Sequence, residues 1–573
     1  MRTVIGYLKV FFSKILLSFG VKIIGTVSEL LIPFILSYVL DNVEGMSVYS
    51  VSMWGVLMML CATSSCVFNV KANRMATGVS RDFVENLRRD LFAKTLRLSA
   101  AQTDKFTIPS LESRITTDTY NVHGFFTMML RMGARSPIVL IGGIVITLIM
   151  DAYLAMVMLA VLPFIFVTVL IVSKKGVKLY KRVQHSVDNM IRIVREDSIG
   201  IRVIKALSKR DYEHRRYEKA NRALIRDEIN AGMIMGASHP IMNFLMNAGI
   251  VGVIALSSGR VADGLSTPGT VIAFMQYFTL LSMAMMTITR MFVMYTKAAA
   301  SAQRIEEVLT SEEEISVMSK DVYPDKKQGA HICFDNVTFS YKGRRNNLEN
   351  INFTVNKGGS LGIIGATGSG KSTIIKLLLR FYDVNEGGIY LDGEDIRTID
   401  KVRLYKKFGS ALQQDFLYAD TIEENIKFGR ELSFDEVVEA AKIAQADDFI
   451  NEFPDKYEHI LSQHGTNISG GQKQRVLISR AIAAKPEILI LDDSSSALDY
   501  KTDATLRRTL AEKMADTTVI TVAQRVSSVK DSDLIIVLDD GKIIGMGKHE
   551  ELLENCIEYR EISDSQMGGA FVE

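Results

Sequence analysis

Six long runs of apolar residues lie within the first 295 positions of this 573-residue chain. The clearest run, at 152–173, reads AYLAMVMLAVLPFIFVTVLIVS and contains no charged residue. A helix needs about 20 consecutive apolar residues to cross a bilayer, so each run predicts a transmembrane helix. The six expected spans lie at about 15–40, 51–72, 133–150, 152–173, 231–258 and 268–295.

The segments that join these runs are of two kinds. The short ones hold a single basic residue, Arg260, and are 41–50, the turn at Asp151, and 259–267. The long ones, 73–130 and 174–230, are rich in Lys and Arg. Because basic segments stay on the cytoplasmic side, we expect the long segments, the N-terminus and the second half of the chain in the cytoplasm, beneath a bacterial cell membrane. The opening MRTVIGYLKVFFSK predicts an amphipathic helix at the inner membrane surface.

The average composition conceals this division. The chain is 48% hydrophobic and 23% charged, with a formal net charge of +2. It therefore lacks the bias of a disordered chain and the basic excess of a nucleic-acid-binding protein. Four cysteines without paired spacing, together with eight histidines, give no support to a disulfide framework or a zinc centre. We expect membrane lipid, and no nucleic acid, among its partners.

A glycine-rich loop follows an apolar strand in the second half of the chain. Residues 361–373 read LGIIGATGSGKST and precede a helix-forming segment. This matches GxxxxGK[ST], in which backbone N–H groups and the helix N-terminus bind phosphates. The pattern predicts ATP contacts from Gly365, Thr367, Gly368, Ser369, Gly370, Lys371, Ser372 and Thr373.

A second apolar strand, in EILILDD, ends at Asp492. A carboxylate at the end of a buried strand is where P-loop proteins hold Mg²⁺, with the loop hydroxyl as a further ligand. Ser372 and Asp492 are therefore candidate Mg²⁺ ligands, and ATP and Mg²⁺ are the expected cofactors.

Three motifs stand in order behind the six spans: the P-loop, NISGGQKQR at 467–475, and LILDDSSSALD at 489–499. In this combination the chain resembles the ATP-binding-cassette exporters of the type IV, drug-exporter-like fold, over nearly its whole length. The resemblance implies an α-helical membrane domain of six transmembrane helices with long cytoplasmic extensions, fused to an α/β P-loop nucleotide-binding domain. The implied boundaries are 1–309 for the membrane domain, 310–330 for a charged linker and 331–573 for the nucleotide-binding domain.

The resemblance also assigns roles to matching positions. Tyr341 is similar to the aromatic residue that stacks on adenine, although it could be an ordinary core aromatic. Gln414 resembles the glutamine that senses Mg²⁺ and water, with Gln413 as its rival. Asp499 resembles the aspartate that links the two ATP sites of a dimer. The signature that closes over the opposite subunit's ATP corresponds to Ser469, Gly470, Gly471 and Gln472.

Two positions depart from the family pattern. Asp493 follows Asp492 where the family has the glutamate that polarises water, and Gln524 stands where a switch histidine is expected. Asp is one methylene shorter than Glu, and a neutral amide cannot relay a proton. We expect a chain that binds ATP but hydrolyses it poorly at its own P-loop. Its partner would be a homologous half-transporter with an intact Glu and His and an altered signature. A homodimer with slow hydrolysis is the alternative.

The cargo is less constrained. The candidate cavity residues are the polar side chains within the apolar runs: Glu29, Asn243, Asn247, Gln276 and Arg290. These side chains could equally join helices or lie near the membrane interface. Methionines gather between Met233 and Met294, as a surface for varied hydrophobic or amphipathic substrates would need, although packing explains them too. We expect multidrug efflux, with a lipid or peptide exporter or an ATP-gated channel as alternatives. Loop helices near 108–118 and 210–222 are expected to transmit the closing motion.

Overall fold

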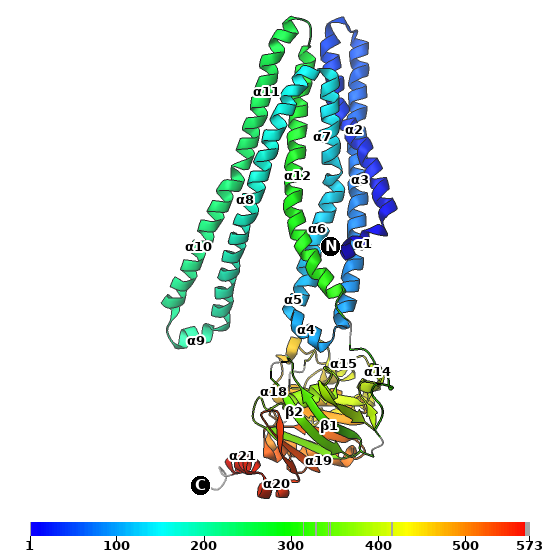
Figure 1. Cartoon of the computed structure of the whole chain (residues 1–573), viewed down its shortest axis with the longest axis vertical. Coiled ribbons are helices and arrows are strands. Elements are labelled where there is room, and N and C mark those ends of the chain that lie inside the picture. The colour runs from blue at the N-terminus through cyan, green and yellow to red at the C-terminus, as the bar shows by residue number, and fades with distance from the viewer. Residues whose placement is uncertain are drawn as a thin grey trace. The chain divides into compact units, whose positions relative to one another are not determined.

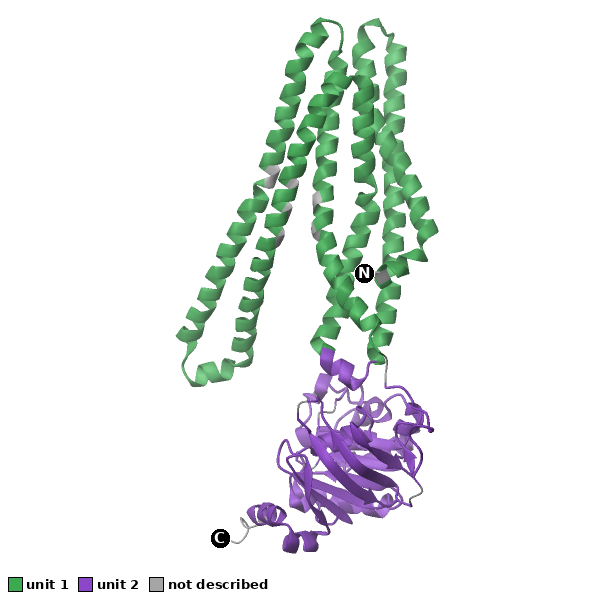
Figure 2. Ribbon diagram, viewed as in Figure 1, with its two compact units in different colours: residues 1–97, 106–312 green, residues 98–105, 313–573 purple. Residues whose placement is uncertain are grey.

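The chain forms two compact units in the computed structural model (Figure 2). The first unit contains Met1–Arg97 and Phe106–Glu312, and the second contains Leu98–Lys105 and Glu313–Glu573. The structure describes residues 2–312, 315–326, 329–341, 343, 345–413, 416–494 and 496–567.

Six continuous helical segments of the first unit are long and apolar enough to cross a membrane, which confirms the expected number of spans. Each is longer than its apolar run because a polar extension continues the helix. The segments are Phe12–Gly45, Val48–Leu96, Ile108–Met150, Ala152–Ile199, Arg210–Ala262 and Pro268–Leu309.

The helices of the N-terminal half carry the labels of Figure 1. They are α1 (Arg2–Lys9), α2 (Phe12–Asn42), α3 (Val48–Leu96), α4 (Ala100–Phe106), α5 (Ile108–Ser113), α6 (Thr119–Met128), α7 (Arg135–Met150), α8 (Ala152–Ile199), α9 (Ile201–Ala206), α10 (Arg210–Gly236), α11 (Ser238–Ala262) and α12 (Pro268–Leu309). Two π-helical turns, η2 (Arg114–Asp118) and η3 (Met129–Gly133), flank α6. Helix α2 packs on α3, α7 and α12, whereas α8 packs on α10 and α11.

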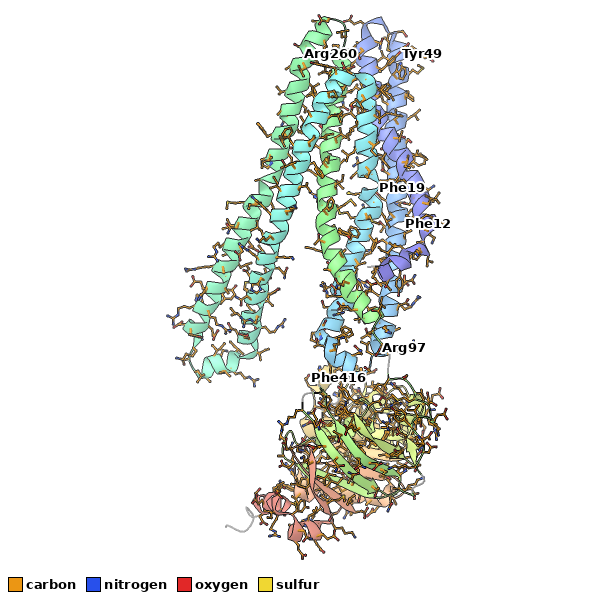
Figure 3. The ribbon with its side chains drawn as sticks, in the orientation of Figure 1. Phe12, Phe19, Tyr49, Arg97, Arg260 and Phe416 are labelled. Atoms are coloured by element: carbon orange, nitrogen blue, oxygen red, sulfur yellow. The ribbon has the colours of Figure 1, made fainter. Side chains whose placement is uncertain are left out.

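Large apolar side chains cover the outside of this unit. Phe12 is 64% exposed and Phe19 is 43% exposed, and both lie on the outer side of α2 (Figure 3). Exposing so large an apolar surface to water would be unfavourable, whereas such a surface is suited to the hydrocarbon of a bilayer.

Aspartates fix the short turns between the spans. Asp151 accepts hydrogen bonds from two N–H groups in the first turn of α8 and pairs with Arg260 at 3.4 Å. Asp41, at the end of α2, accepts a 2.7 Å hydrogen bond from the N–H of Gly269 in α12. These contacts hold α2 to α12 and α8 to α11 at the same end of the bundle (Figure 1).

The short helices at the polar ends of the long ones lie earlier in the chain than expected. They are α4 and α9, whereas the segments 108–118 and 210–222 are helical as the first turns of the third and fifth long helices, and their part in transmitting the closing motion stays a prediction. The breaks fall at Thr107, with φ +62°, and Ser208, with φ +52°. A left-handed conformation at a non-glycine residue leaves no clear signal in the sequence.

Two sheets form the framework of the second unit. The four-stranded sheet is antiparallel, in the order β2-β1-β4-β5, and the six-stranded sheet has the order β10-β9-β3-β8-β7-β6. All neighbours in the larger sheet are parallel except β10 and β9. The strands are β1 (Ile332–Phe339), β2 (Leu348–Val355), β3 (Ser360–Gly365), β4 (Glu386–Leu391), β5 (Glu394–Asp395), β6 (Phe408–Ala411), β7 (Ile488–Asp492), β8 (Thr518–Val522), β9 (Leu534–Asp539) and β10 (Lys542–Gly547).

Helices cover the parallel sheet, giving the expected α/β domain fused to an α-helical membrane domain. They are α13 (Lys371–Leu378), α14 (Lys401–Lys406), α15 (Ile422–Lys427), α16 (Phe434–Ile443), α17 (Asp447–Asn451), α18 (Gly470–Ile482), α19 (Tyr500–Lys513), α20 (His549–Asn555) and α21 (Ile557–Met567). Strand β7 is buried along its whole length, and β3 along nearly all of it. Since both are parallel to β8, which lies between them, their carboxyl ends meet at one edge of the sheet.

Candidate active site

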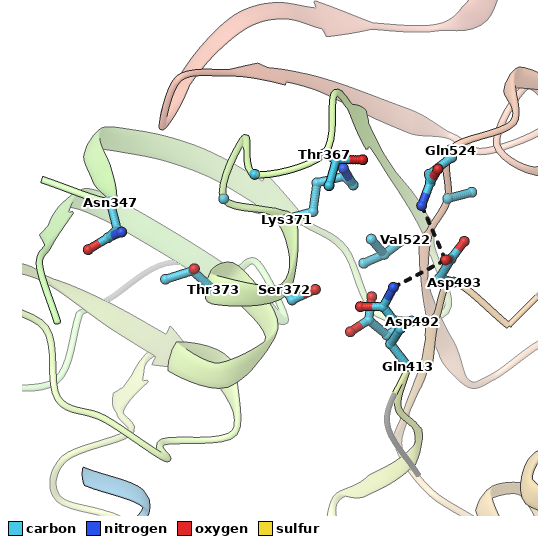
Figure 4. Close-up of a pocket in the computed structure, with 13 residues that line it drawn as sticks. Asn347, Thr367, Lys371, Ser372, Thr373, Gln413, Asp492, Asp493, Val522 and Gln524 are labelled. Atoms are coloured by element: carbon cyan, nitrogen blue, oxygen red, sulfur yellow. Dashed lines mark hydrogen bonds between the residues drawn. The ribbon is translucent and has the colours of Figure 1, made fainter. Parts of the chain in front are cut away.

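The loop after β3 requires glycine at two positions. A Cβ on Gly365 would lie 2.1 Å from the carbonyl oxygen of Leu538, so no larger residue fits there. Gly370 has φ +108° and directly precedes α13, a conformation that residues with a Cβ rarely adopt. The loop therefore wraps tightly and delivers Lys371 and Ser372 to the first turn of the helix (Figure 4).

Lys371 brings a positive charge to the pocket beside this loop. Its Nζ donates hydrogen bonds of 2.8 Å to the carbonyl oxygens of Gly365 and Ala366. Burial lowers the pKa of Lys371, while the carboxylates of Asp493 and Asp492 act in the opposite direction. The ammonium group of Lys371 therefore faces a pocket whose opposite wall carries the carboxylates of Asp492 and Asp493.

Asp492 ends β7 and is 5% exposed. Burial raises the pKa of Asp492, and a hydrogen bond from the Ser372 hydroxyl partly offsets this rise. A hydroxyl and a carboxylate oxygen side by side are the hard oxygen ligands that Mg²⁺ takes in phosphate sites. These two predicted ligands therefore fit a magnesium ion.

Asp493 follows Asp492 on the wall of the pocket that faces Lys371. Its backbone has a left-handed conformation, with φ +53°. Its Oδ2 accepts hydrogen bonds from Gln413 Nε2 at 3.4 Å and Gln524 Nε2 at 3.3 Å (Figure 4). Burial raises the pKa of Asp493, against the opposing charge of Lys371. The two unusual positions of the sequence, Asp493 and Gln524, thus bond directly to each other.

Gln414 and Gln413 are the two candidates for the glutamine that senses Mg²⁺ and water. Gln414 lies outside the described residues, so its place in the site stays a prediction. Gln413, its rival, lines the pocket and donates to Asp493.

Tyr341 follows β1 and is 38% exposed. Its ring packs edge-to-face on Tyr382, with centroids 5.0 Å apart, and its hydroxyl donates to Thr373 Oγ1 at 3.4 Å. Lys376 Nζ lies 5.6 Å from the ring centroid. The tyrosine is therefore a partly exposed ring next to α13, rather than a core aromatic.

The signature residues begin α18. Ser469 caps this helix, because its Oγ accepts from the N–H of Gln472 at 3.2 Å while Gln472 Oε1 accepts from the N–H of Ser469 at 2.9 Å. Gly471 packs closely, since a Cβ there would lie 3.0 Å from the carbonyl oxygen of Ala497. Within the described part of the chain, these residues are not among those that line the P-loop pocket.

Asp499 begins α19 as its N-terminal cap. Its carboxylate accepts from the N–H and the hydroxyl of Thr502, at 2.9 Å and 2.7 Å, which lowers the pKa of Asp499.

The candidate cavity residues are not gathered into one described pocket. Glu29 of α2 pairs with Arg135 of α7 at 2.5 Å, so this carboxylate joins two helices. Asn243 and Gln276 are half-buried, whereas Asn247 and Arg290 are exposed.

Asn347 also lines the P-loop pocket, together with Val522 and Ala523 at the end of β8. The Asn347 side chain accepts a 3.1 Å hydrogen bond from the N–H of Tyr341. No sequence pattern indicates Asn347, because a lone asparagine between two strands carries no motif.

Comparisons with known proteins agree with this architecture. Residues 15–285 match a family profile described as ABC transporter transmembrane region, and residues 348–496 match one described as ABC transporter. The chain is 34% identical over 543 residues to YfiB, an uncharacterised ABC transporter ATP-binding protein of Bacillus subtilis (strain 168), covering 94% of each chain. It is 31% identical to the putative ABC transporter ATP-binding protein exp8 of Streptococcus pneumoniae serotype 4, covering 99% of this chain and 97% of that protein.

A solved structure shares the fold over the whole chain. It is a bacterial Atm1-family ABC exporter with ATP bound, 25% identical, with a TM-score of 0.81 and 99% of each chain covered.

Proposed function

The chain belongs to the ABC transporter family, as a membrane domain fused to its ATPase domain, and on this premise we propose that it is the weakly hydrolytic subunit of a heterodimeric exporter. The family and fold make it an ATP-hydrolysing, multi-pass membrane transporter of the exporter type. The proposal concerns the division of work between this chain and a partner.

The observation that carries the proposal is the hydrogen bonding of Asp493. A general base must reach the attacking water and accept its proton. The Asp493 carboxylate is shorter than that of Glu by one methylene, and one of its oxygens already accepts from two amides, Gln413 and Gln524. A misplacement of about 1 Å costs roughly 10²-fold in rate, so this carboxylate is a poor base.

The rest of the pocket retains what ATP binding needs. The loop amides and Lys371 would hold the phosphates, Ser372 and Asp492 would hold Mg²⁺, and Tyr341 would stack on adenine. Bound Mg²⁺ neutralises the phosphate charge. Tight binding with slow hydrolysis is the expected behaviour of such a site.

The intact signature gives this chain a second role. Ser469, Gly470 and Gly471 begin α18, where backbone N–H groups and the positive end of the helix dipole favour a phosphate. We propose that this end closes over ATP held by the partner's P-loop, and that Asp499 links the two sites. The partner would supply the glutamate and histidine that this chain lacks, and carry an altered signature.

For the cargo, we propose hydrophobic or amphipathic compounds taken from the cytoplasm or inner leaflet. The support is the group of methionines in α10 to α12, whose flexible side chains accept varied shapes. Lipid or peptide export remains the alternative. An ATP-gated channel would be recognised by passive current.

The test is the ATPase rate of the purified chain alone, in lipid nanodiscs, compared with its Asp493→Asn variant and with the co-purified pair. We expect a slow rate that Asp493→Asn hardly changes, and a much faster rate for the pair. A brisk rate from this chain alone that disappears in Asp493→Asn would overturn the heterodimer.

A further inference from the structure

A basic pocket lies on the membrane unit between α3 and the π-helical turn η3. Its volume is about 490 Å³, within the range of roughly 300–1,000 Å³ common for ligand sites. The side chains from α3 are spaced three and four residues apart, so they share one helix face. The lining includes Asn73, Arg74, Thr77, Gly78, Arg81 and Arg131.

Two arginines of this pocket have no anionic partner among the described residues. Arg131 Nε is buried and makes no hydrogen bond to any described residue. No carboxylate of the described chain pairs with Arg74 or Arg131, whereas Arg81 pairs with Asp82 at 2.7 Å. A buried guanidinium donor without an acceptor is costly, so an acceptor from outside the chain would stabilise it.

The surrounding charges do not neutralise the pocket. Lys22 of α2 is 4% exposed, and its Nζ donates to Asn73 Oδ1, a neutral acceptor, at 3.0 Å. The nearby carboxylate of Glu29 is bound by both Nε and Nη2 of Arg135, at 3.2 Å and 2.5 Å. The pocket therefore keeps a positive balance from Lys22, Arg74 and Arg131.

The pocket lies at the level where two apolar runs end. In α3 the run 51–72 stops just before Asn73, and the run 133–150 begins just after Arg131. In the proposed orientation this is the cytoplasmic end of the spans, the depth of lipid head groups. Basic pockets between helices at this depth are suited to anionic head groups.

We propose that this pocket binds a phosphate-bearing anion, held by the guanidinium groups of Arg74 and Arg131. Planar guanidinium groups bind phosphate oxygens through two parallel hydrogen bonds, which a lysine cannot do. An anionic lipid of the inner leaflet and a free phosphorylated solute share this chemistry. The cytoplasmic placement rests on the proposed function, but the binding itself does not depend on ATP hydrolysis.

The experiment measures retention of phosphatidylglycerol by the full chain. Protein in neutral detergent is titrated with phosphatidylglycerol or phosphatidylcholine, and bound lipid is counted by native mass spectrometry. The double variant Arg74→Gln/Arg131→Gln is compared with Arg182→Gln/Arg195→Gln, which removes the same charge from exposed positions of α8. We expect preferential retention of phosphatidylglycerol, weakened by about tenfold for each arginine lost in the pocket, and unchanged in the matched control.

Two further arms complete the test. Arg131→Lys keeps the charge but not the paired donors, so it should fold normally and lose most of the preference. Inorganic phosphate at millimolar concentration is then added as competitor. Displacement of the lipid identifies a phosphate-sized site open to solutes, and retention identifies the lipid as the source. Equal retention of both lipids, or equal loss in the pocket and control variants, would overturn the proposal. Neither result would alter the ATPase measurements that test the heterodimer.

Discussion

At the scale of single residues, the proposal of weak hydrolysis rests on Asp493 and Gln524. A histidine would place a second titratable group against the γ-phosphate, whereas the Gln524 amide only donates to the neighbouring carboxylate. The two substitutions also fit each other, because a shorter acid leaves room for an amide to bond it. In the proposed weak site the two residues would therefore act together, since they are hydrogen-bonded to each other.

Restoring both residues should restore hydrolysis. We expect Asp493→Glu/Gln524→His to raise the ATPase rate of the isolated chain by about 10²-fold, the lower range for a positioned general base. Each single variant should give far less, since Glu alone is still bonded by the amide. The steady-state phosphate release rate measures this. An unchanged rate in the double variant, with ATP binding intact, would show that something other than these residues limits hydrolysis.

Tyr341 allows a sharper test of nucleotide binding. Stacking of a base on an aromatic ring contributes about 1–3 kcal/mol, so Tyr341→Ala should weaken binding of a fluorescent ATP analogue by roughly 5- to 150-fold. Tyr341→Phe keeps the ring and loses only the 3.4 Å hydrogen bond to Thr373, so it should bind almost normally. Similar loss in both variants would mean that the hydroxyl, and not stacking, is what matters.

At the scale of elements, α21 holds the loop that carries Gln524. Gln566 accepts from the N–H of Val526 at 2.8 Å and donates to the carbonyl oxygen of Gln524 at 2.9 Å. A C-terminal helix thus fixes the backbone on both sides of Arg525.

Gln566→Ala should loosen this loop. We expect faster amide hydrogen exchange at 523–529 and, in the Asp493→Glu/Gln524→His background, a fall of several-fold in ATPase rate, because the restored histidine would no longer be held in place. Ser565→Ala, at the exposed neighbouring position, is the matched control. Equally fast exchange in both variants would show that the Gln566 side chain does not hold this loop.

The π-helical turn η2 is joined to α12 by two crossed ion pairs. Asp118, 1% exposed, pairs with Arg304, and Arg114 pairs with Glu307 at 3.0 Å. The Arg304 side chain is 47% exposed, so the buried charge of this pair is the Asp118 carboxylate, and removing Arg304 would leave it uncompensated at a cost of about 3–5 kcal/mol.

Arg304→Gln should therefore lower the thermal unfolding temperature of the chain in detergent by several degrees, because it leaves the Asp118 carboxylate buried without its partner. Asp118→Asn/Arg304→Gln should recover part of the loss, since no charge then stays buried alone. Glu112→Gln, an exposed carboxylate in the preceding turn, is the control. If the double variant is as unstable as the sum of the two single variants, the pair is not coupled.

The sequence predicted these elements unevenly, for physical reasons. A helix that crosses a bilayer must be apolar over its whole span, and a loop that binds phosphates must keep its glycines and lysine at fixed spacing. The six spans and the strand–loop–helix at 361–378 were therefore predictable. The positions of α4 and α9 were harder to predict, because only Pro109 marks the break at Thr107 and no glycine or proline stands next to the break at Ser208. The contacts of Gln566 with Gln524 and Val526 join segments about 40 residues apart, which no local pattern encodes.

At the scale of the whole molecule, the P-loop and the signature belong to different ATP sites if the proposed dimer forms. Damage to each should then have a different effect on the pair. The P-loop of this chain would serve the slow site, and its signature would serve the partner's fast site. A variant of the signature must leave α18 intact for this comparison to be meaningful.

Ser469→Asp meets that condition, because Asp is as good a helix cap as Ser but places a negative charge where the signature would meet the γ-phosphate. In the co-purified pair we expect this variant to reduce ATPase activity by about 10²-fold or more, the order of losing an oriented phosphate donor. Lys371→Ala in the same chain should reduce it by less than about tenfold, since only the slow site loses its nucleotide. Ser469→Thr, which keeps the hydroxyl, is the control and should stay near the wild-type rate. Equal losses from Ser469→Asp and Lys371→Ala would mean that the two sites work alike, and the asymmetric dimer would have to be abandoned.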